Sequence, residues 1–596
     1  MKLTARLRST VDDFVLVIGP AWRRAPWVLV LMTISIALDL SAVLLAAPFV
    51  TLLMSQNSAG FELPLWLVAL GAPSKFSLEA IGALVAGVFI VKAVISTRLQ
   101  YAIAWFSEQR RAELMLVLLR SYQHKPYEFH ITHNSSELVN RVIWETQYFT
   151  GAGLNALMRI FVECATTLVL ITVLALAEWR ALALLLVCIA IVFVVVLRSV
   201  RRATATVVAH QQATQAKIIG AVQQALAGYR EIRLLRCEGT FQAQLSDSAH
   251  AQAVSVSRAA GLASIPRQAI ECTVVCVLVL LVYLSTHRAG GFDGLLTTLG
   301  TFAMAAMRLM PASTAILGSI NSVRSARPVT GKLAHALREL ATEPPKAEPP
   351  PIRSREPFNS IELKSVGYHY PNQKYPALSD VNLVIRKGEL IGIMGRSGAG
   401  KSTLADVLLG FLKPQTGDVL VNQRPASPDT PGLQEYAAYI PQTVYLLDDS
   451  IRRNVAFGEP EEAINEERVW NALTQAQLAD FVSSLTEGVN THVGERGVRM
   501  SGGQRQRVAI ARAIYHRREV IVLDEATSAL DAQTEREVIS ALNHMHGHQT
   551  LIVIAHKTSV LAAADRIVRV ENGRLLIEER HNESAHHHST ETAATL

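Results

Sequence analysis

The sequence predicts two parts, a helical membrane domain with six spans and a soluble α/β domain that follows it. Half of the 596 residues are hydrophobic and only 18% are charged, whereas soluble domains carry about 25% charged residues. Long apolar segments occur only before residue 320, and short β-type runs alternate with helical runs after residue 357. A single soluble domain and a disordered chain are therefore excluded.

The six apolar segments are each close to the ~20 residues that cross a ~30 Å hydrocarbon core. The first begins too late in the chain to be a cleaved signal peptide. The outer segments 55–78, 178–180 and 287–292 hold one Lys or Arg each, and the inner segments hold many more, so both termini are predicted to be cytoplasmic. The predicted spans are residues 27–50, 79–104, 155–177, 181–199, 265–286 and 293–316.

The net charge of +7, from 57 Lys and Arg against 50 Asp and Glu, follows from this loop bias and does not indicate a nucleic-acid partner. Five cysteines are too few for a disulfide framework. The long inner loops, 105–154 and 200–264, are rich in helix-forming residues and are expected to continue the spanning helices.

The composition divides the chain into five regions. A polar C-terminal tail contains His586, His587 and His588, which could bind a metal but are more typical of a solvated chain end. The regions are an N-terminal elbow segment 1–26, a membrane domain 27–325, a Pro-rich linker 326–357, an α/β domain 358–580 and the tail 581–596.

A phosphate-binding loop is predicted at residues 395–403, GRSGAGKST, which follow an apparent strand at 390–394 and precede a helix. Its glycines let backbone N–H groups approach phosphate oxygens, and the helix N-terminus adds partial positive charge. Lys401 is expected to reach the β- and γ-phosphates, and the Ser402 hydroxyl to bind Mg²⁺. The predicted loop contacts are Gly395, Ser397, Gly398, Ala399, Gly400, Lys401, Ser402 and Thr403.

A second motif is acidic. The sequence VIVLDE at residues 520–525 has the form of an apolar strand that ends in two carboxylates. Asp524 is expected to hold Mg²⁺ through water, and Glu525 to polarise the attacking water in phosphoryl transfer.

The motif MSGGQ at residues 500–504, followed by RQR, completes a set that resembles the ATP-binding cassette (ABC) transporters. This resemblance implies ATP and Mg²⁺ as cofactors. It also implies that Tyr370 stacks on adenine and that Gln442 links Mg²⁺ to the membrane domain. The implied signature that closes over ATP of the opposite cassette is Ser501, Gly502, Gly503 and Gln504. Asp531 matches the family's dimer-contact loop, and His556 matches its γ-phosphate switch histidine. Residues 491–497 resemble the segment with which exporters of this family touch the coupling helices.

The order of six spans and then one cassette resembles the exporter-type half-transporter. The resemblance implies a type I ABC exporter in the bacterial inner membrane, in which ATP hydrolysis drives alternating access. One cassette supplies half of each composite ATP site, so two copies are expected to assemble. Because Glu525, His556 and the signature are intact, a homodimer is favoured over a heterodimer.

Five ionisable residues lie within the spans and define a candidate cargo cavity. Each would cost about 2.5–3.5 kcal/mol at the centre of a bilayer unless it is paired or faces water. Lys92 and Arg308 could neutralise the phosphates of an anionic amphiphile, or they could pair with the acids and lock helices together. The five residues are Asp39, Lys92, Glu163, Glu271 and Arg308.

Two further segments suggest a cargo. Residues 63–70 in the outer loop are apolar enough to lie in the membrane interface, with Trp66 as anchor. With Asp39 and residues 126–138, this pattern is similar to the lipid-linked oligosaccharide flippases and their polysaccharide-exporter relatives. Residues 134–138 could equally be a helix cap with a coupling role, and Phe129 and His130 are expected to dock on the cassette in either case.

The resemblance implies a polyprenyl-pyrophosphate oligosaccharide as cargo, an amphipathic glycolipid flipped toward the outer face. The alternatives are an exporter of lipid A-like lipids, hydrophobic drugs or peptides, and a non-transporting ATP-gated membrane protein.

Overall fold

The computed structural model divides into two units. The helical unit comprises Met1–His124 and Asn134–Pro345, and the α/β unit comprises Lys125–His133 and Lys346–Leu596. The structure describes residues 2–24, 26–54, 61–62, 75–76, 78–286, 293–342, 356–371, 373–426, 432–494, 497–525, 532–555, 557 and 561–579.

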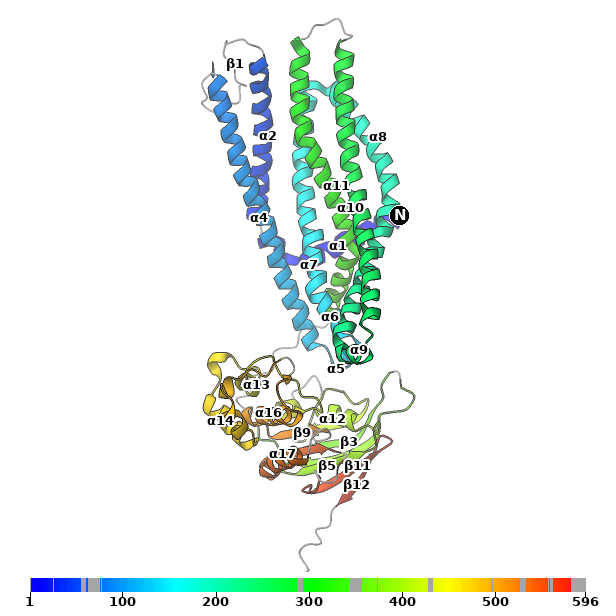
Figure 1. Cartoon of the computed structure of the whole chain (residues 1–596), viewed down its shortest axis with the longest axis vertical. Helices are drawn as coiled ribbons and strands as arrows, with labels where there is room; N and C mark the ends of the chain where they lie inside the picture. Colours follow the sequence, from blue (N-terminus) through cyan, green and yellow to red (C-terminus); the bar gives the residue numbers. More distant parts are fainter. Residues whose placement is uncertain are drawn as a thin grey trace, which may run out of the picture. The chain divides into compact units, whose positions relative to one another are not determined.

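All six predicted apolar segments lie in helices of the helical unit (Figure 1). The long helices are α2 (Pro26–Met54), α4 (Leu78–His124), α8 (Asn155–Ala227), α10 (Glu238–Thr286) and α11 (Asp293–Thr342). The shorter elements are α1 (Lys2–Ile18), η1 (Gly19–Arg24), β1 (Phe61–Glu62), β2 (Lys75–Phe76), α6 (Ser135–Asn140), η2 (Arg141–Glu145), α7 (Thr146–Tyr148), η3 (Phe149–Leu154) and α9 (Tyr229–Leu235).

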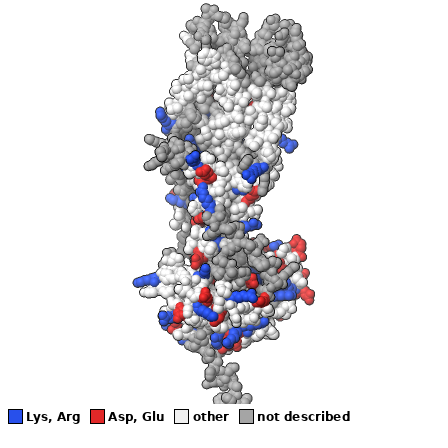
Figure 2. Space-filling view, turned by 180° about the vertical axis from the view of Figure 1, so that it is seen from behind, with Lys and Arg blue, Asp and Glu red and all other residues white. Residues whose placement is uncertain are grey.

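Part of the surface of these helices is apolar, as a lipid-facing surface must be. Ile90 and Val94 of α4 are 67% and 56% exposed, and one face in Figure 2 shows a broad area without charged side chains. Within the described residues, Gly82–His124 and Glu137–Thr172 are long and apolar enough to cross a membrane, and Arg8–Ala21 with Pro26–Ala42 form a bent third candidate.

Two boundaries differ from the sequence-based prediction. The outer segment 178–180 does not interrupt the helix, because α8 continues through it without a Gly or Pro to end it. The ribbon of α8 instead changes direction in Figure 1. The expected linker also begins later, since α11 continues to Thr342 although Pro328 lies within it, and the helix ends just before Pro344.

The inner segments are helical, as predicted. Helix α4 extends to His124, and α8, α9 and α10 occupy residues 200–264 almost without a break. Helix α6 begins directly after Asn134, whose carbonyl accepts the backbone N–H of Glu137 at 2.9 Å, so the capping interpretation of this segment is compatible with the structure.

The α/β unit contains two sheets and their covering helices. The six-stranded sheet has the order β12-β11-β5-β10-β9-β8, in which all neighbours are parallel except β11 and β12. Its strands are β5 (Leu390–Gly395), β8 (Ala437–Ile440), β9 (Val520–Asp524), β10 (Thr550–Ile554), β11 (Arg566–Glu571) and β12 (Arg574–Glu579). The antiparallel sheet β4-β3-β6-β7 consists of β3 (Ser360–Tyr368), β4 (Leu378–Arg386), β6 (Thr416–Val421) and β7 (Arg424–Pro425).

Two buried clusters form the core of this unit, and β5 contributes to both because its two faces are covered. Leu390 packs into one cluster, whereas Ile391 and Ile393 pack into the other. The helices are α5 (Tyr127–Thr132), α12 (Lys401–Leu408), α13 (Ile451–Val455), α14 (Glu466–Gln475), α15 (Ala479–Ser484), α16 (Gly502–Tyr515) and α17 (Ala532–Met545), with short turns η5 (Leu433–Glu435), η6 (Glu461–Ala463) and η7 (Gly488–Asn490).

Candidate nucleotide site

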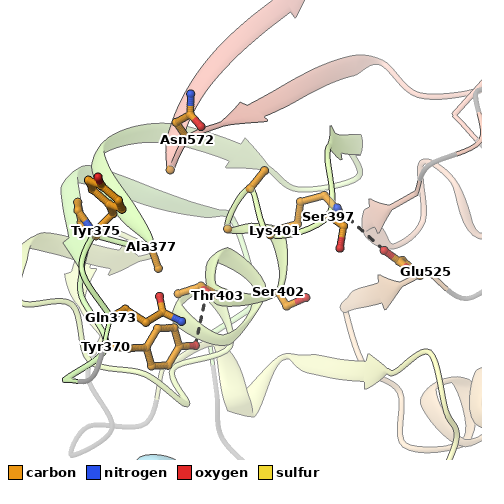
Figure 3. A pocket seen from close by; sticks show the side chains of 15 residues that line it. Tyr370, Gln373, Tyr375, Ala377, Ser397, Lys401, Ser402, Thr403, Glu525 and Asn572 are labelled. Atoms are coloured by element: carbon orange, nitrogen blue, oxygen red, sulfur yellow. Dashed lines mark hydrogen bonds and ion pairs between the residues drawn. The ribbon is translucent and has the colours of Figure 1, made fainter.

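A cavity of about 700 Å³ lies at the carboxyl end of β5, where the predicted phosphate-binding loop turns into α12 (Figure 3). Ligands of open parallel sheets bind at this end of the strands. The cavity brings together Tyr370, residues 397–403 and Glu525, which the sequence had placed in one site from separate motifs.

The loop geometry requires glycine at position 400. Gly400 has φ +109°, and a Cβ there would lie 2.4 Å from the carbonyl oxygen of Ala377. Gly400 directly precedes α12, so the free N–H groups of the first turn of α12 are placed beside the cavity. The local fold therefore builds an anion-binding loop.

Lys401 is buried, and its ammonium group is held close to the loop. Its Nζ donates to the carbonyl oxygens of Gly395 at 2.9 Å and Arg396 at 3.1 Å, and lies 4.0 Å from Glu525 Oε1. Figure 3 shows this ion pair across the cavity wall. Gly395 thus takes part in the loop by holding Lys401, although it does not line the cavity.

The other end of the cavity is aromatic. The hydroxyl of Tyr370 lies 3.4 Å from Thr403 Oγ1, and its ring meets Tyr368 edge-to-face with centroids 5.0 Å apart. Sequence analysis missed Gln373, Tyr375 and the Asn572–Gly573 turn, which also line the cavity. The Asn-Gly pair is a hairpin signal, but only the tertiary structure brings it beside this loop.

Asp524 and Glu525 lie where β9 ends. Burial raises the pKa of Asp524, and the neighbouring Glu525 carboxylate acts in the same direction, while the Tyr439 hydroxyl, 3.2 Å from Asp524 Oδ2, and Lys401 oppose the shift. Glu525 has φ +47°, an unfavourable backbone conformation that is typical of functional sites. Its Oε2 accepts a hydrogen bond of 3.1 Å from Gln442 Nε2.

The donor set at this end of the sheet fits Mg²⁺. Ser402 supplies a hydroxyl, Asp524 a carboxylate and Gln442 an amide oxygen, the hard oxygen ligands that Mg²⁺ binds together with phosphates and water. No group of three or more His, Cys, Asp or Glu forms a metal site among the residues described.

The signature residues form the start of α16. Ser501 Oγ accepts the Gln504 backbone N–H at 3.2 Å, and Gln504 Oε1 accepts the Ser501 N–H at 2.8 Å, which makes a reciprocal cap with Gly502 and Gly503 in the first turn. These four residues do not line the cavity of their own chain. Asp531 and His556 lie outside the described residues.

Of the five ionisable residues in the spans, the structure brings two together. Lys92 Nζ lies 2.6 Å from Asp39 Oδ1, and Asp39 is only 2% exposed. Glu163 is half-buried on α8 and Glu271 is exposed on α10. Arg308 belongs to α11, but its side chain is outside the described residues, as are residues 63–70 and the three tail histidines.

The short helix α5 contacts the rest of the α/β unit through residues that sequence analysis did not single out. Tyr127 packs on Phe411 with ring centroids 5.3 Å apart, and the Tyr368 hydroxyl donates to Glu128. Phe129 has ring contacts with His130 and His133 of its own segment, and docking by Phe129 and His130 stays a prediction.

Known proteins resemble both parts of the chain. The model of the ABC transporter transmembrane region matches residues 27–310, and that of the ABC transporter domain matches residues 378–528. Among solved structures, a bacterial Atm1-family ABC exporter with ATP bound has a TM-score of 0.70 and 21% identity, with 93% of this chain and 94% of that chain covered. At this identity the likeness concerns the fold.

Similar curated proteins carry the name ATP-dependent lipid A-core flippase. That of Pseudoalteromonas atlantica is 29% identical over 508 residues, covering 83% of this chain and 84% of its own. Those of Yersinia pestis and Vibrio cholerae are each 27% identical, covering 84% and 86% of this chain and 85% and 87% of their own. With two ABC transporter models covering most of its length in the order membrane region then cassette, this chain belongs to the ABC transporters and has the type I exporter fold with an ATP-hydrolysing cassette.

Proposed function

We propose that two copies of this chain form an ATP-driven flippase that moves a lipid A-like glycolipid from the cytoplasmic to the outer face of the bacterial inner membrane. The observation that carries this proposal is the alignment with lipid A-core flippases over more than four-fifths of both chains. A long apolar helical unit joined to a phosphate-binding cassette supplies the architecture that this activity needs.

The polyprenyl-pyrophosphate oligosaccharide expected from the sequence has less support than a lipid A-like cargo. Both cargoes are anionic amphiphiles with a large sugar headgroup. Lys92, one of the two basic residues considered for their phosphates, lies 2.6 Å from Asp39. This ion pair favours the helix-locking interpretation for Lys92 and leaves Arg308 as the basic residue to examine for cargo.

ATP hydrolysis is assigned to the loop and to the acids at the end of β9. The N–H groups of residues 398–403 and the Lys401 ammonium bind the phosphates, and Tyr370 stacks on the base. Ser402, Gln442 and Asp524 would hold Mg²⁺, which neutralises charge on the phosphates. Glu525 accepts the proton of the attacking water, and its hydrogen bond to Gln442 at 3.1 Å fixes the orientation of the carboxylate.

The signature points to a dimer. In each chain, Ser501 to Gln504 cap a helix away from the chain's own cavity, so a second copy would supply the signature that closes each ATP site. Intact Glu525 in a homodimer gives two working sites. The excess of Lys and Arg in the inner loops supports a cytoplasmic location for both termini.

The test is ATP-dependent flipping in proteoliposomes that contain either a fluorescent lipid A-like lipid or a polyprenyl-pyrophosphate oligosaccharide, with Glu525→Gln protein as the control. Movement of the first lipid by the unsubstituted protein alone is expected. Movement of only the second would restore the oligosaccharide cargo. ATP hydrolysis without movement of either lipid would refute both glycolipid cargoes and leave an exporter of hydrophobic drugs or peptides, or the non-transporting alternative.

A further inference from the structure

One hydrogen bond joins α5 to the strand that precedes the adenine-stacking residue of the proposed ATP site. The hydroxyl of Tyr368, the last residue of β3, donates to Glu128 Oε1 at 2.6 Å. Tyr368 is only 2% exposed. Burial and the Glu128 carboxylate raise the pKa of Tyr368, so that its hydroxyl stays protonated and remains a donor. A neutral donor to a carboxylate forms one of the stronger hydrogen bonds in proteins.

The ring of Tyr368 in turn supports Tyr370. The two rings meet edge-to-face at 83°, with centroids 5.0 Å apart. This arrangement is favourable for aromatic pairs and depends on ring orientation. The hydroxyl of Tyr370 makes a long hydrogen bond of 3.4 Å with Thr403, which constrains the ring weakly, so the Tyr368 ring is a major constraint on the wall where the base would stack.

A second contact holds α5 independently of this bond. The ring of Tyr127 packs on Phe411, directly after the turn that ends α12, with centroids 5.3 Å apart. Removal of the Tyr368 hydroxyl would therefore leave α5 with an apolar anchor. Glu128 is itself exposed, so Tyr368→Phe does not leave a buried charge without its hydrogen-bond donor.

We propose that Glu128 and Tyr368 are a positioning pair for the nucleotide base, in which Glu128 holds the Tyr368 ring and the ring holds Tyr370 in its stacking orientation. This inference rests on the proposed stacking role of Tyr370. Because α5 lies in the chain between α4 and α6, displacement of α5 would break the bond and lower ATP affinity. Binding of ATP would by reciprocity favour the docked position of α5.

The experiment compares two ligands that differ in the base. The full-length protein is purified, and the KM for ATP and the inhibition constant of tripolyphosphate, which has no base, are measured in each variant. In Tyr368→Phe and in Glu128→Ala the KM for ATP should rise about 3- to 10-fold, with kcat and tripolyphosphate inhibition unchanged. The double variant should be no worse than either single variant, because both remove the same bond. Glu128→Gln keeps an acceptor oxygen and should restore most of the affinity.

Tyr436→Phe is the matched control. Tyr436 is also buried in this unit, and its hydroxyl donates at 3.0 Å to the carbonyl oxygen of Glu356. The Tyr436→Phe variant should leave both the KM for ATP and the inhibition constant of tripolyphosphate unchanged. An unchanged KM for ATP in Tyr368→Phe, or an equal weakening of ATP and tripolyphosphate, would overturn the positioning role.

The Tyr370→Ala variant distinguishes a failure of the positioning pair from a failure of the proposed stacking role of Tyr370. If Tyr370→Ala weakens ATP binding but Tyr368→Phe does not, the positioning pair alone is wrong and the ATP site stands. If Tyr370→Ala leaves ATP binding unchanged, the stacking role fails, and the positioning pair fails with it.

Discussion

Replacement of Lys92 by Met should destabilise the helical unit by leaving Asp39 without its ion-pair partner. The two charges lie 2.6 Å apart, and the side chains are 21% and 3% exposed for Lys92 and Asp39. With an effective dielectric constant of ~20, the attraction at this distance is about 6 kcal/mol. Desolvation of both groups offsets part of it, so loss of one partner should cost about 3–5 kcal/mol.

The double variant Lys92→Met with Asp39→Leu removes both charges and should recover most of this loss, because an apolar pair of similar volume is compatible with the membrane interior. The measurement is the thermal midpoint of the detergent-solubilised protein, followed by tryptophan fluorescence. The single variant should lower the midpoint by about 5–10 °C. Arg233→Met is the matched control, because the side chains of Arg233 and its partner Glu238 are 71% and 36% exposed, and a solvent-screened pair should contribute little to stability.

The result that refutes this reasoning is additivity. If the losses of the two single variants add in the double variant, the charges do not stabilise one another. If Lys92→Met keeps the wild-type midpoint but loses stimulation of ATP hydrolysis by an anionic lipid, Lys92 acts on cargo, and the interpretation of the pair as a helix lock is wrong.

Three further predictions concern the cassette. Lys401→Ala should lose ATP affinity by at least 10-fold, about 1.4 kcal/mol, in equilibrium binding; normal affinity would mean that Lys401 does not bind phosphate. Glu525→Gln should bind ATP but lose about 10²–10⁴-fold in turnover, since an amide cannot accept the proton of water; near-normal turnover would exclude a base role. Burial, with the charge of Asp524, raises the pKa of Asp406 from 3.8 to about 6, so the folded domain binds the extra proton and loses stability as pH rises from about 4 to 6. Asp406→Asn should therefore raise the thermal midpoint at pH 7.5 but not at pH 4, and a gain at both pH values would contradict this account.

Features that depend on residues close together in the chain could be predicted from the sequence. The loop at 395–403 is one strand, one turn and one helix start, so its chemistry follows from local order, and the structure places Lys401 and Glu525 together as the motifs imply. The apolar segments also needed no tertiary information, because length and composition decide whether a helix can cross a membrane.

The sequence-based prediction was wrong at two helix boundaries, where the residue pattern alone does not decide whether the helix ends. Residues 178–180 are charged and aromatic, which indicates a turn in a hydropathy profile, but Glu178, Trp179 and Arg180 are compatible with a helix and α8 runs through them. The start of the linker was predicted too early because a proline does not always end a helix: α11 passes through Pro328 and ends only before Pro344.

The sequence by itself determined the class of the protein: a membrane-spanning helical domain followed by an ATP-hydrolysing cassette. Only the tertiary structure decided the partners of residues far apart in the chain. Lys92 could have paired with any of three acids, and the packing of α2 against α4 places it beside Asp39. Glu128 and Tyr368, 240 residues apart, meet because α5 docks on the α/β unit. Such pairings follow from which helices and strands pack together, and spacing along the chain does not encode that choice.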